Sequence, residues 1–349
     1  MKKKARVASI GVGMIGQVHA QALAKEQACD YVAICDVDAS KKELADSYGV
    51  AFYRDFTEMI EREDLDGVVV AVPNHQHAGV GVDCAEHGLH VFMEKPIAPS
   101  IEESEELIKA AARNNVKLAV GHHRRFNPLL TELREIIRRG ELGRVVGISM
   151  LWGMYKPDDY FVQGPWRKEP GGGPILINLI HEIDNLRYTY GEIVSVYAEV
   201  SSAARGFTVE DTVGVTIRMK DNAIANVLLT DTVPSIWAYE QTMGEFDFFY
   251  QGKGNIYHFF GQEASLVFPE MIKVSYPKDG PRGWQHPVEL KQLYRSNGNP
   301  YPAQMHHFCN VTLGLEEPRT TGEDALQSLR VAMGVAESGL SHKPVVFDV

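Results

Sequence analysis

The chain has 349 residues, 44% of them hydrophobic, and a formal net charge of −11 at pH 7. This length exceeds what one hydrophobic core usually supports, so we expect two domains of about 100 to 200 residues each. The negative charge and the scattered basic residues argue against nucleic acid or an anionic membrane as the main partner, and no segment approaches the roughly 20 apolar residues that span a bilayer. The four cysteines contain no closely spaced pair, which is typical of reduced thiols in the cytoplasm.

Short apolar strands alternate with helices over the first third of the chain. Strands are predicted at 6–10, 31–35, 67–72, 90–93 and 117–120, and helices at 14–25, 80–86 and 101–114. Apolar runs without polar alternation are typical of strands that are buried on both faces of a parallel sheet. The pattern therefore predicts an α/β fold with a doubly wound parallel sheet.

A glycine-rich turn follows the first predicted strand, and its residues Gly11, Gly13 and Gly16 are spaced as in a dinucleotide-binding fingerprint. The first glycine permits a tight turn, the second lets the backbone approach a pyrophosphate, and the third lets helix and strand pack closely. Backbone donors at the helix start, which include Met14 and Ile15, favour the phosphates. The turn predicts a bound dinucleotide, whereas the alternative is a glycine turn without a ligand.

Polar residues follow the next strands of the predicted sheet. Asp36 ends the second strand about 20 residues beyond the last glycine, where a carboxylate binds adenosine ribose hydroxyls. Because this carboxylate would repel a ribose phosphate, we expect NAD to be preferred over NADP. Pro73, Asn74 and His77 follow the strand 67–72 and are candidates for contact with the nicotinamide half, although Asn74 could instead cap the next helix.

Lys95 lies directly after the apolar strand 90–93, between Glu94 and Pro96. In an open parallel sheet the ligand crevice lies outside the carboxyl ends of the strands, so Lys95 is the best candidate for the chemistry and Glu94 is expected beside the cofactor. The alternative interpretation is a surface lysine in a turn before a proline.

These motifs, together with 121–128, 171–173, 181–184 and 301–304, resemble the Gfo/Idh/MocA oxidoreductases, the family of glucose-fructose oxidoreductase and inositol dehydrogenase. The resemblance covers nearly the whole chain. It implies a Rossmann domain, expected over 1–124, and a substrate-binding and oligomerisation α/β domain with a large, open, mostly antiparallel sheet, expected over 125–349. It also implies that Lys95 takes part in the reaction and that the Lys95-Pro96 peptide is cis.

The second part of the chain begins with a predicted helix over 128–137, capped by Asn127 with proline in the first position. Sheet strands are predicted at 145–152, 194–200, 211–219, 223–231, 264–268 and 272–276. Asp221 and Asn222 supply a hairpin turn between two of them.

A polar stripe follows the glycine loop 171–173. If this segment is helical, Asn178, His181 and Asp184 recur three apart and share one face. Unpaired buried polar groups are costly, so the stripe needs a partner such as a bound polyol and Lys95, unless His181 is a satisfied core histidine. Many family members have an acidic or amide residue where this chain has Ile177. Asn178 lies one position further on and can orient a substrate, but it cannot be a carboxylate base.

These placements predict a reaction in which a hydride leaves a secondary alcohol for the nicotinamide. His181 is the expected proton acceptor and Lys95 the expected donor to the same oxygen, although the two roles could be exchanged. Further residues are expected to line a sugar pocket, each with a structural alternative such as packing or a surface ion pair: Arg125, Tyr155, Trp166, Arg167, Gln304 and His307.

The sequence leaves three functions open. The first is an NAD-dependent dehydrogenase of a sugar, inositol or related polyol, with a cis-dihydrodiol as a further conceivable substrate. The second is a hydrolase or lyase that retains NAD and uses transient oxidation, and the third is a noncatalytic NAD-binding sensor, against which Lys95 and His181 argue. No metal is expected, because the paired histidines are poorly spaced for one ion. An exposed sheet face favours a homodimer or homotetramer.

Overall fold

The computed structural model describes residues 4–294, 296 and 298–348, and the chain divides into two compact units. The first unit comprises Met1–Phe126 and Asn299–Leu329, and the second comprises Asn127–Gly298 and Arg330–Val349. The division therefore differs from the expected single boundary after residue 124, because a late segment of the chain returns to the first unit.

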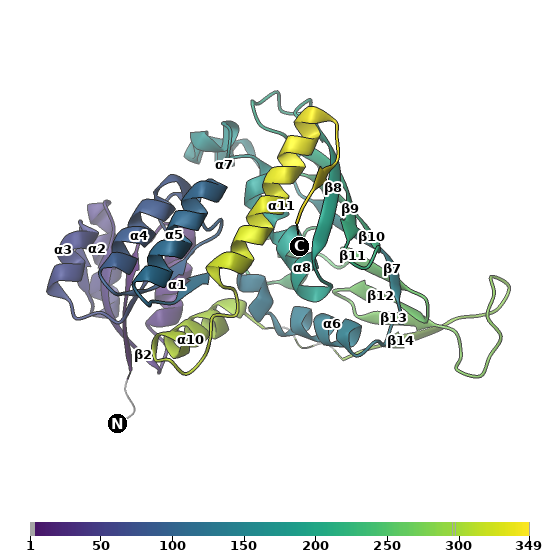
Figure 1. Ribbon diagram of the computed structural model, residues 1–349, viewed down its shortest axis with the longest axis horizontal. Coiled ribbons are helices and arrows are strands. Elements are labelled where there is room, and N and C mark those ends of the chain that lie inside the picture. Colours follow the sequence, from purple (N-terminus) through teal and green to yellow (C-terminus); the bar gives the residue numbers. More distant parts are fainter. Residues whose placement is uncertain (1–3, 295, 297, 349) are drawn as a thin grey trace. The chain divides into compact units, whose positions relative to one another are not determined.

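The first unit contains a six-stranded parallel sheet with the order β3-β2-β1-β4-β5-β6 (Figure 1). Its strands are β1 (Ala5–Ile10), β2 (Cys29–Cys35), β3 (Ala51–Tyr53), β4 (Gly67–Val70), β5 (His90–Met93) and β6 (Leu118–Val120). This is the order of a Rossmann fold, with the ligand crevice expected where the order reverses between β1 and β4. The predicted doubly wound sheet is confirmed, although β3 was not predicted.

Helical elements lie between the successive parallel strands along the chain. They are α1 (Met14–Leu23), α2 (Lys42–Tyr48), α3 (Phe56–Arg62), α4 (His77–Glu86) and α5 (Ile101–Arg113), with short 3-10 turns η1 (Ala39–Lys41), η2 (Asn74–Gln76) and η3 (His123–Phe126). The helices α2 and α3 were not predicted; each is only seven residues long, too short to show a clear helical periodicity of apolar residues.

The late segment belongs to the first unit because its helix α10 (Pro300–Thr312) completes the core there. Met305, Phe308 and Cys309 of α10 are fully buried in one cluster with β1 and α1 residues such as Val7 and Leu23. The segment after α10 also joins the sheet, since the Thr320 carbonyl accepts a hydrogen bond from the Val120 amide. Sequence periodicity does not reveal this return, because contacts far apart in sequence decide it.

The second unit is built on a nine-stranded sheet with the order β14-β13-β12-β11-β7-β10-β9-β8-β15 (Figure 1). Its strands are β7 (Val145–Gly153), β8 (Ile193–Ser201), β9 (Thr212–Met219), β10 (Ile224–Thr230), β11 (Tyr257–Gly261), β12 (Ala264–Phe268), β13 (Ile272–Ser275), β14 (Glu289–Gln292) and β15 (Val345–Val346). All neighbours are antiparallel except β7 and β10. The expected open, mostly antiparallel sheet is confirmed, and β11, β14 and β15 are additional strands.

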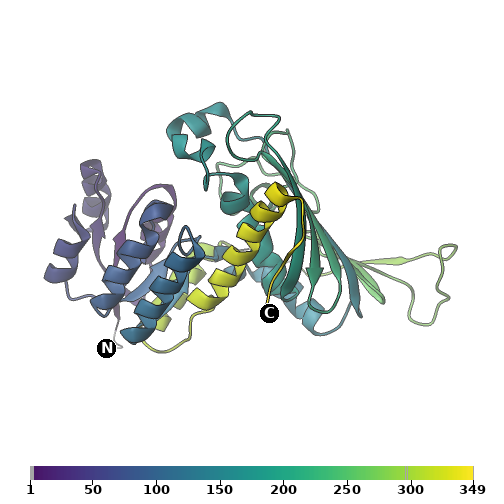
Figure 2. The ribbon, with the colours of Figure 1, turned by 45° about the horizontal axis from the view of Figure 1, so that its top comes forward.

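Helices cover one face of this sheet (Figures 1 and 2). They include α6 (Pro128–Arg138), α8 (Ile180–Thr189) and the end of α11 (Gly322–Ser341), whose Ser338 accepts a hydrogen bond from the Ala198 amide at 2.9 Å. Shorter elements are α7 (Asp158–Gln163), the 3-10 turn η4 (Pro165–Lys168), the π-helix η5 (Ile175–Leu179) and α9 (Tyr239–Met243). Asn127 caps α6 as predicted. No helix in the described part of the chain is both long and apolar enough to cross a membrane.

Candidate functional site

The glycine turn joins β1 to α1 and has the geometry of a phosphate cradle. Gly11 has a φ of +83°, and a Cβ there would lie 2.7 Å from the Ala71 carbonyl oxygen. A Cβ on Gly16 would lie 2.2 Å from the Gly11 carbonyl oxygen, whereas one on Gly13 meets no protein atom within 4 Å. Gly13 caps α1 without a side-chain hydrogen bond, so the first helical amides are left for a ligand. The open space lies at the one glycine whose backbone is expected to approach the pyrophosphate.

Asp36 lies at the end of β2, and its carboxylate is fixed against the glycine turn. Oδ2 accepts a hydrogen bond from the Val12 amide at 2.8 Å, and Oδ1 accepts one from the Asp38 amide at 2.9 Å. Met14, which follows the glycine turn, and Val37, which follows Asp36, are 68% and 78% exposed. The residues present therefore fit a dinucleotide whose ribose meets Asp36.

Asn74 and His77 both follow β4, but they have different surroundings. Asn74 begins η2 but caps neither η2 nor α4 through its side chain, which removes the capping alternative. His77 is buried, with Nδ1 2.7 Å from the Pro96 carbonyl oxygen and Nε2 2.9 Å from the Val72 carbonyl oxygen. Burial lowers the pKa of His77. Its ring thus ties the segment after β4 to the segment that carries Lys95.

Lys95 follows β5, and the Lys95-Pro96 peptide is cis, as expected. Glu94 beside it is buried, with Oε1 2.7 Å from Nε2 of His19 and Oε2 accepting a hydrogen bond from the Lys95 amide at 3.1 Å. Although burial alone would raise the pKa of Glu94, the hydrogen bond and charge of His19 lower it to about 2. The buried carboxylate is therefore ionised, and it holds the backbone of Lys95.

His181 and Asn178 lie on consecutive helical elements of the second unit. Asn178 belongs to the π-helix η5, and His181 lies in the first turn of α8. Both side chains are more than nine-tenths buried. π-helical turns are rare and occur often at functional sites. The predicted stripe assumed one regular α-helix. Asn178 instead lies in the π-helical turn before α8, where the number of residues per turn is larger.

Lys156 is a buried residue that the sequence analysis missed. Its Nζ donates to Oδ1 of Asn178 at 2.7 Å and lies 3.3 Å from Oδ2 of Asp231. Burial lowers its pKa to about 8, against the opposing charge of Asp231. A signal was present, because Lys156 precedes Pro157 just after β7, in the same order as Lys95 and Pro96 after β5.

Three of the expected sugar-binding residues, Tyr155, Trp166 and Arg167, belong to the same segment of the chain as Lys156. Tyr155 and Trp166 are about half exposed, at 54% and 50%. The Arg167 guanidinium lies 3.8 Å from the centre of the Tyr160 ring, which in turn lies 5.4 Å from Lys156 Nζ. Exposed aromatic rings beside buried polar groups are the ordinary composition of a small-molecule site.

The other three expected residues lie in the first unit. Arg125 is buried and forms an ion pair with Asp324. Both ring nitrogens of His307 are used, one by Glu316 and one by the Arg319 amide at 2.9 Å, which is a structural role. Gln304 is 1% exposed, and its amide atoms have no hydrogen-bond partner among the described residues.

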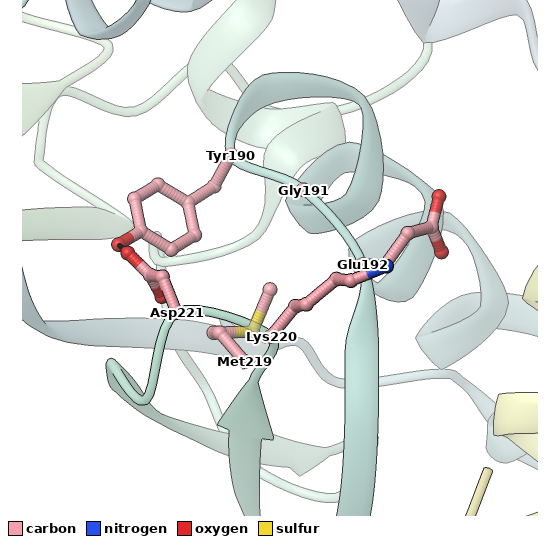
Figure 3. A pocket seen from close by; sticks show the side chains of 6 residues that line it. All are labelled: Tyr190, Gly191, Glu192, Met219, Lys220 and Asp221. Carbon is pink, nitrogen blue, oxygen red and sulfur yellow. Dashed lines mark hydrogen bonds between the residues drawn. The ribbon is translucent and has the colours of Figure 1, made fainter. Parts of the chain in front are cut away.

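A pocket of about 360 Å³ lies elsewhere in the second unit, where α8 leads into β8 and β9 turns into β10 (Figure 3). Figure 3 shows the Tyr190 hydroxyl beside the Asp221 carboxylate, to which it donates a hydrogen bond. Its six lining residues include none of the predicted site residues. The described residues also contain no group of three or more His, Cys, Asp or Glu arranged to hold a metal ion.

Strand order, glycine turn and Asp36 together define a dinucleotide-binding Rossmann domain. Residues 5–122 match the model of an oxidoreductase family with an NAD-binding Rossmann fold, and residues 130–266 match the model of the Gfo/Idh/MocA C-terminal domain. The chain belongs to the Gfo/Idh/MocA family of oxidoreductases, as the sequence motifs predicted.

Two individual proteins and one solved structure show the same similarity. The myo-inositol 2-dehydrogenase of Thermotoga maritima is 27% identical over 344 residues, which are 95% of this chain and 96% of that protein. The rhizopine catabolism protein MocA of Rhizobium meliloti is 34% identical over 189 residues, 54% of this chain and 57% of that protein. The WlbA dehydrogenase from Bordetella pertussis, solved in complex with NADH and UDP-GlcNAcA, superimposes with a TM-score of 0.80 at 21% identity, covering 99% of this chain and 100% of that chain. This structural likeness shows the shared fold.

Proposed function

We propose that the protein is a dehydrogenase that oxidises a secondary alcohol of a sugar, inositol or related polyol with NAD. The observation that carries the substrate class is the similarity to a myo-inositol 2-dehydrogenase over nearly the full length of both chains. The composition around Lys156 and Asn178 supports it, because aromatic rings and fixed polar groups suit a hydroxylated ring or chain.

The proposed roles of the protein groups follow from their chemistry. The nicotinamide accepts a hydride from the carbinol carbon. His181 accepts the hydroxyl proton, since an imidazole titrates near neutral pH, and Lys95 donates a hydrogen bond to the same oxygen and stabilises its developing negative charge. Glu94, whose pKa is lowered to about 2, accepts a hydrogen bond from the Lys95 amide and so fixes the backbone of Lys95.

Asp36 supports a preference for NAD over NADP. Its two carboxylate oxygens are held by the Val12 and Asp38 amides, so the negative charge cannot turn away from a ribose phosphate without breaking those bonds. A carboxylate held where the ribose phosphate of NADP would bind disfavours that binding, because like charges repel.

A panel of sugars, inositols and sugar acids with NAD, followed at the nicotinamide absorbance, tests the function. We expect NADH to accumulate with at least one polyol, and we expect His181→Ala and Lys95→Ala each to lower kcat by about 100-fold or more. A His181→Ala variant with near-normal turnover would overturn its role. Product formed without NADH would point instead to a hydrolase or lyase that retains NAD.

We further propose that the exposed face of the nine-stranded sheet joins copies of this chain into a homodimer or homotetramer. Ile224, Leu228 and Phe260 are 45% to 51% exposed. Ile224 and Phe260 are both paired with Gly147 in the sheet, so they lie on either side of a residue without a side chain. An apolar surface on an open sheet is typical of a subunit contact.

A further inference from the structure

The contact between Lys156 and Asn178 fixes which end of the Asn178 amide faces outward. Lys156 Nζ lies 2.7 Å from the side-chain atom of Asn178 assigned as Oδ1. An ammonium group or an amine beside an amide oxygen acts as the donor, and the amide NH2 cannot accept in return. The assignment of oxygen and nitrogen in this amide is therefore settled by its partner.

The consequence is an amide NH2 group that is turned away from Lys156. Nδ2 has no hydrogen bond to any residue in the described ranges, and it keeps contact with solvent, although Asn178 as a whole is only 9% exposed. A donor that is fixed in direction and still reached by solvent can exchange its water for an oxygen of a bound molecule. The orientation that Lys156 imposes therefore makes this NH2 group available to a ligand.

Lys156 is itself held rigidly on several sides. Its Nζ lies 3.3 Å from Oδ2 of Asp231, whose other oxygen accepts from Nε of Arg205 at 2.8 Å. The Trp152 and Tyr160 rings lie 5.6 Å and 5.4 Å from Nζ. An ammonium fixed by a shared carboxylate and by two aromatic faces has little freedom to release the Asn178 oxygen.

We propose that Lys156 is a positioning residue that presents the Asn178 amide as a hydrogen-bond donor to an oxygen of the substrate. This inference rests on the proposed dehydrogenase function and deepens it, because Asn178 lies three residues before His181. It also sets specificity. The substrate group that meets Asn178 must be an acceptor such as a hydroxyl, ring, carbonyl or carboxylate oxygen, and a protonated amino group at that position is rejected.

The first experiment needs no substrate. In protein labelled with ¹⁵N in the asparagine side chains, the Asn178 signals are identified by their loss in Asn178→Asp. We expect Lys156→Met to shift and broaden these signals, because the freed amide rotates, while Lys156→Arg retains a donor and alters them less. Lys273→Met is the matched control, since Lys273 is a half-buried lysine of the same unit that pairs with Glu141 at 3.0 Å. Asn178 signals that are unchanged in Lys156→Met would overturn the positioning role.

The second experiment uses the polyol that gives NADH in the panel, together with its amino-sugar analogue. Lys156→Met is expected to raise KM about tenfold or more while kcat changes less, because the lost interaction binds rather than reacts. Lys156→Arg is expected to restore part of the affinity, and Asn178→Asp to improve the amino-sugar analogue relative to the polyol. Equal KM values for Lys156→Met and Lys273→Met would overturn the proposal. If no polyol is oxidised, the proposed function fails, and the labelled amide still decides whether Lys156 orients Asn178.

Discussion

Nε2 of His19 lies 2.7 Å from Oε1 of Glu94, and neither side chain is more than 7% exposed. His19 belongs to α1, the helix that begins at the glycine turn, and Glu94 immediately precedes Lys95. The pair therefore links the helix that is expected to receive the phosphates to the backbone of the proposed catalytic lysine. The aromatic rings of Phe92 and Tyr301, at 5.2 Å and 5.6 Å from the His19 ring, exclude water from it.

Removing His19 is predicted to destabilise the protein strongly. His19→Leu leaves the Glu94 carboxylate buried without its partner, which costs about 3–5 kcal/mol of the free energy of unfolding. His306→Leu is the matched control, because His306 forms the same kind of pair with Glu26 but is 55% exposed, where such pairs contribute about 1 kcal/mol or less. Urea unfolding of both variants measures the difference. Similar losses for the two variants would contradict the assignment of the buried pair.

The same carboxylate predicts a loss of stability in acid. The pKa of Glu94 is lowered from 4.5 to about 2, chiefly by its hydrogen bond to His19 against the cost of burial. A carboxyl whose pKa is lower in the folded state stabilises that state above pH 4.5, and this contribution is lost as the pH falls toward 2. The contribution of Glu94 to the free energy of unfolding is at most on the order of 3 kcal/mol. Unfolding free energies of the wild type and Glu94→Gln, measured over this range, should converge in acid; parallel curves would exclude Glu94 as the titrating group.

Gly13 and Gly16 are predicted to respond differently to the same substitution. Gly13→Ala should change the unfolding free energy by no more than about 1 kcal/mol, because its Cβ meets no protein atom, yet weaken NAD binding about tenfold or more. Gly16→Ala should reduce both stability and binding, since its Cβ would lie 2.2 Å from the Gly11 carbonyl oxygen. Gly79→Ala, equally open, is the control for stability and binding. NAD titration and thermal unfolding separate these effects, and unimpaired NAD binding by Gly13→Ala would place the pyrophosphate elsewhere.

Asp36 is predicted to select the cofactor. Asp36→Asn keeps an oxygen for the Val12 amide but removes the negative charge, so the ratio of kcat/KM for NADP over NAD should rise about tenfold, or about 1.4 kcal/mol. Asp46→Asn removes a charge from an exposed pair with Lys42 and should leave the ratio unchanged. Without an identified substrate, titrations with NAD and NADP measure the same preference as a ratio of Kd values. A wild type that already prefers NADP would refute the role of Asp36.

Features that local chemistry decides could be predicted from the sequence, whereas features that contacts between distant residues decide could not. The glycine spacing, the strand 90–93 and the Asn127 cap are local patterns, and the structure contains each of them. The ring of His77 was expected beside the cofactor, but its two carbonyl partners lie 5 and 19 residues away and only the folded chain brings them together.

The same limit applies to the cluster around Lys156. Asp231 and Asn178 come from different elements far along the chain, so no spacing rule connects them to this lysine. Only the order of lysine and proline after a strand hinted at Lys156. The sequence predicted polar site residues of the second unit that lie on one helical segment. It did not predict those whose neighbours come from other strands and loops.

The final prediction concerns the exposed sheet face. Leu228 lies in the middle of β10 and is 51% exposed, with Leu151 and Gly214 beside it on the neighbouring strands. If the proposed oligomer forms through this face, Leu228→Arg should convert it to a monomer in light-scattering measurements, because the contact would have to bury a charge without a partner. Its own fold should lose little, since substitutions at exposed positions usually change stability by about 0.5 kcal/mol or less.

Leu315→Arg provides the control for Leu228→Arg, because Leu315 is 70% exposed in the first unit and lies outside the sheet face. It should leave the oligomer intact, so a monomer produced by both variants would indicate general destabilisation. An oligomer that survives Leu228→Arg would exclude the centre of this face as the contact. NAD binding serves as the independent check, since the glycine turn belongs to the first unit and should bind equally in monomer and oligomer.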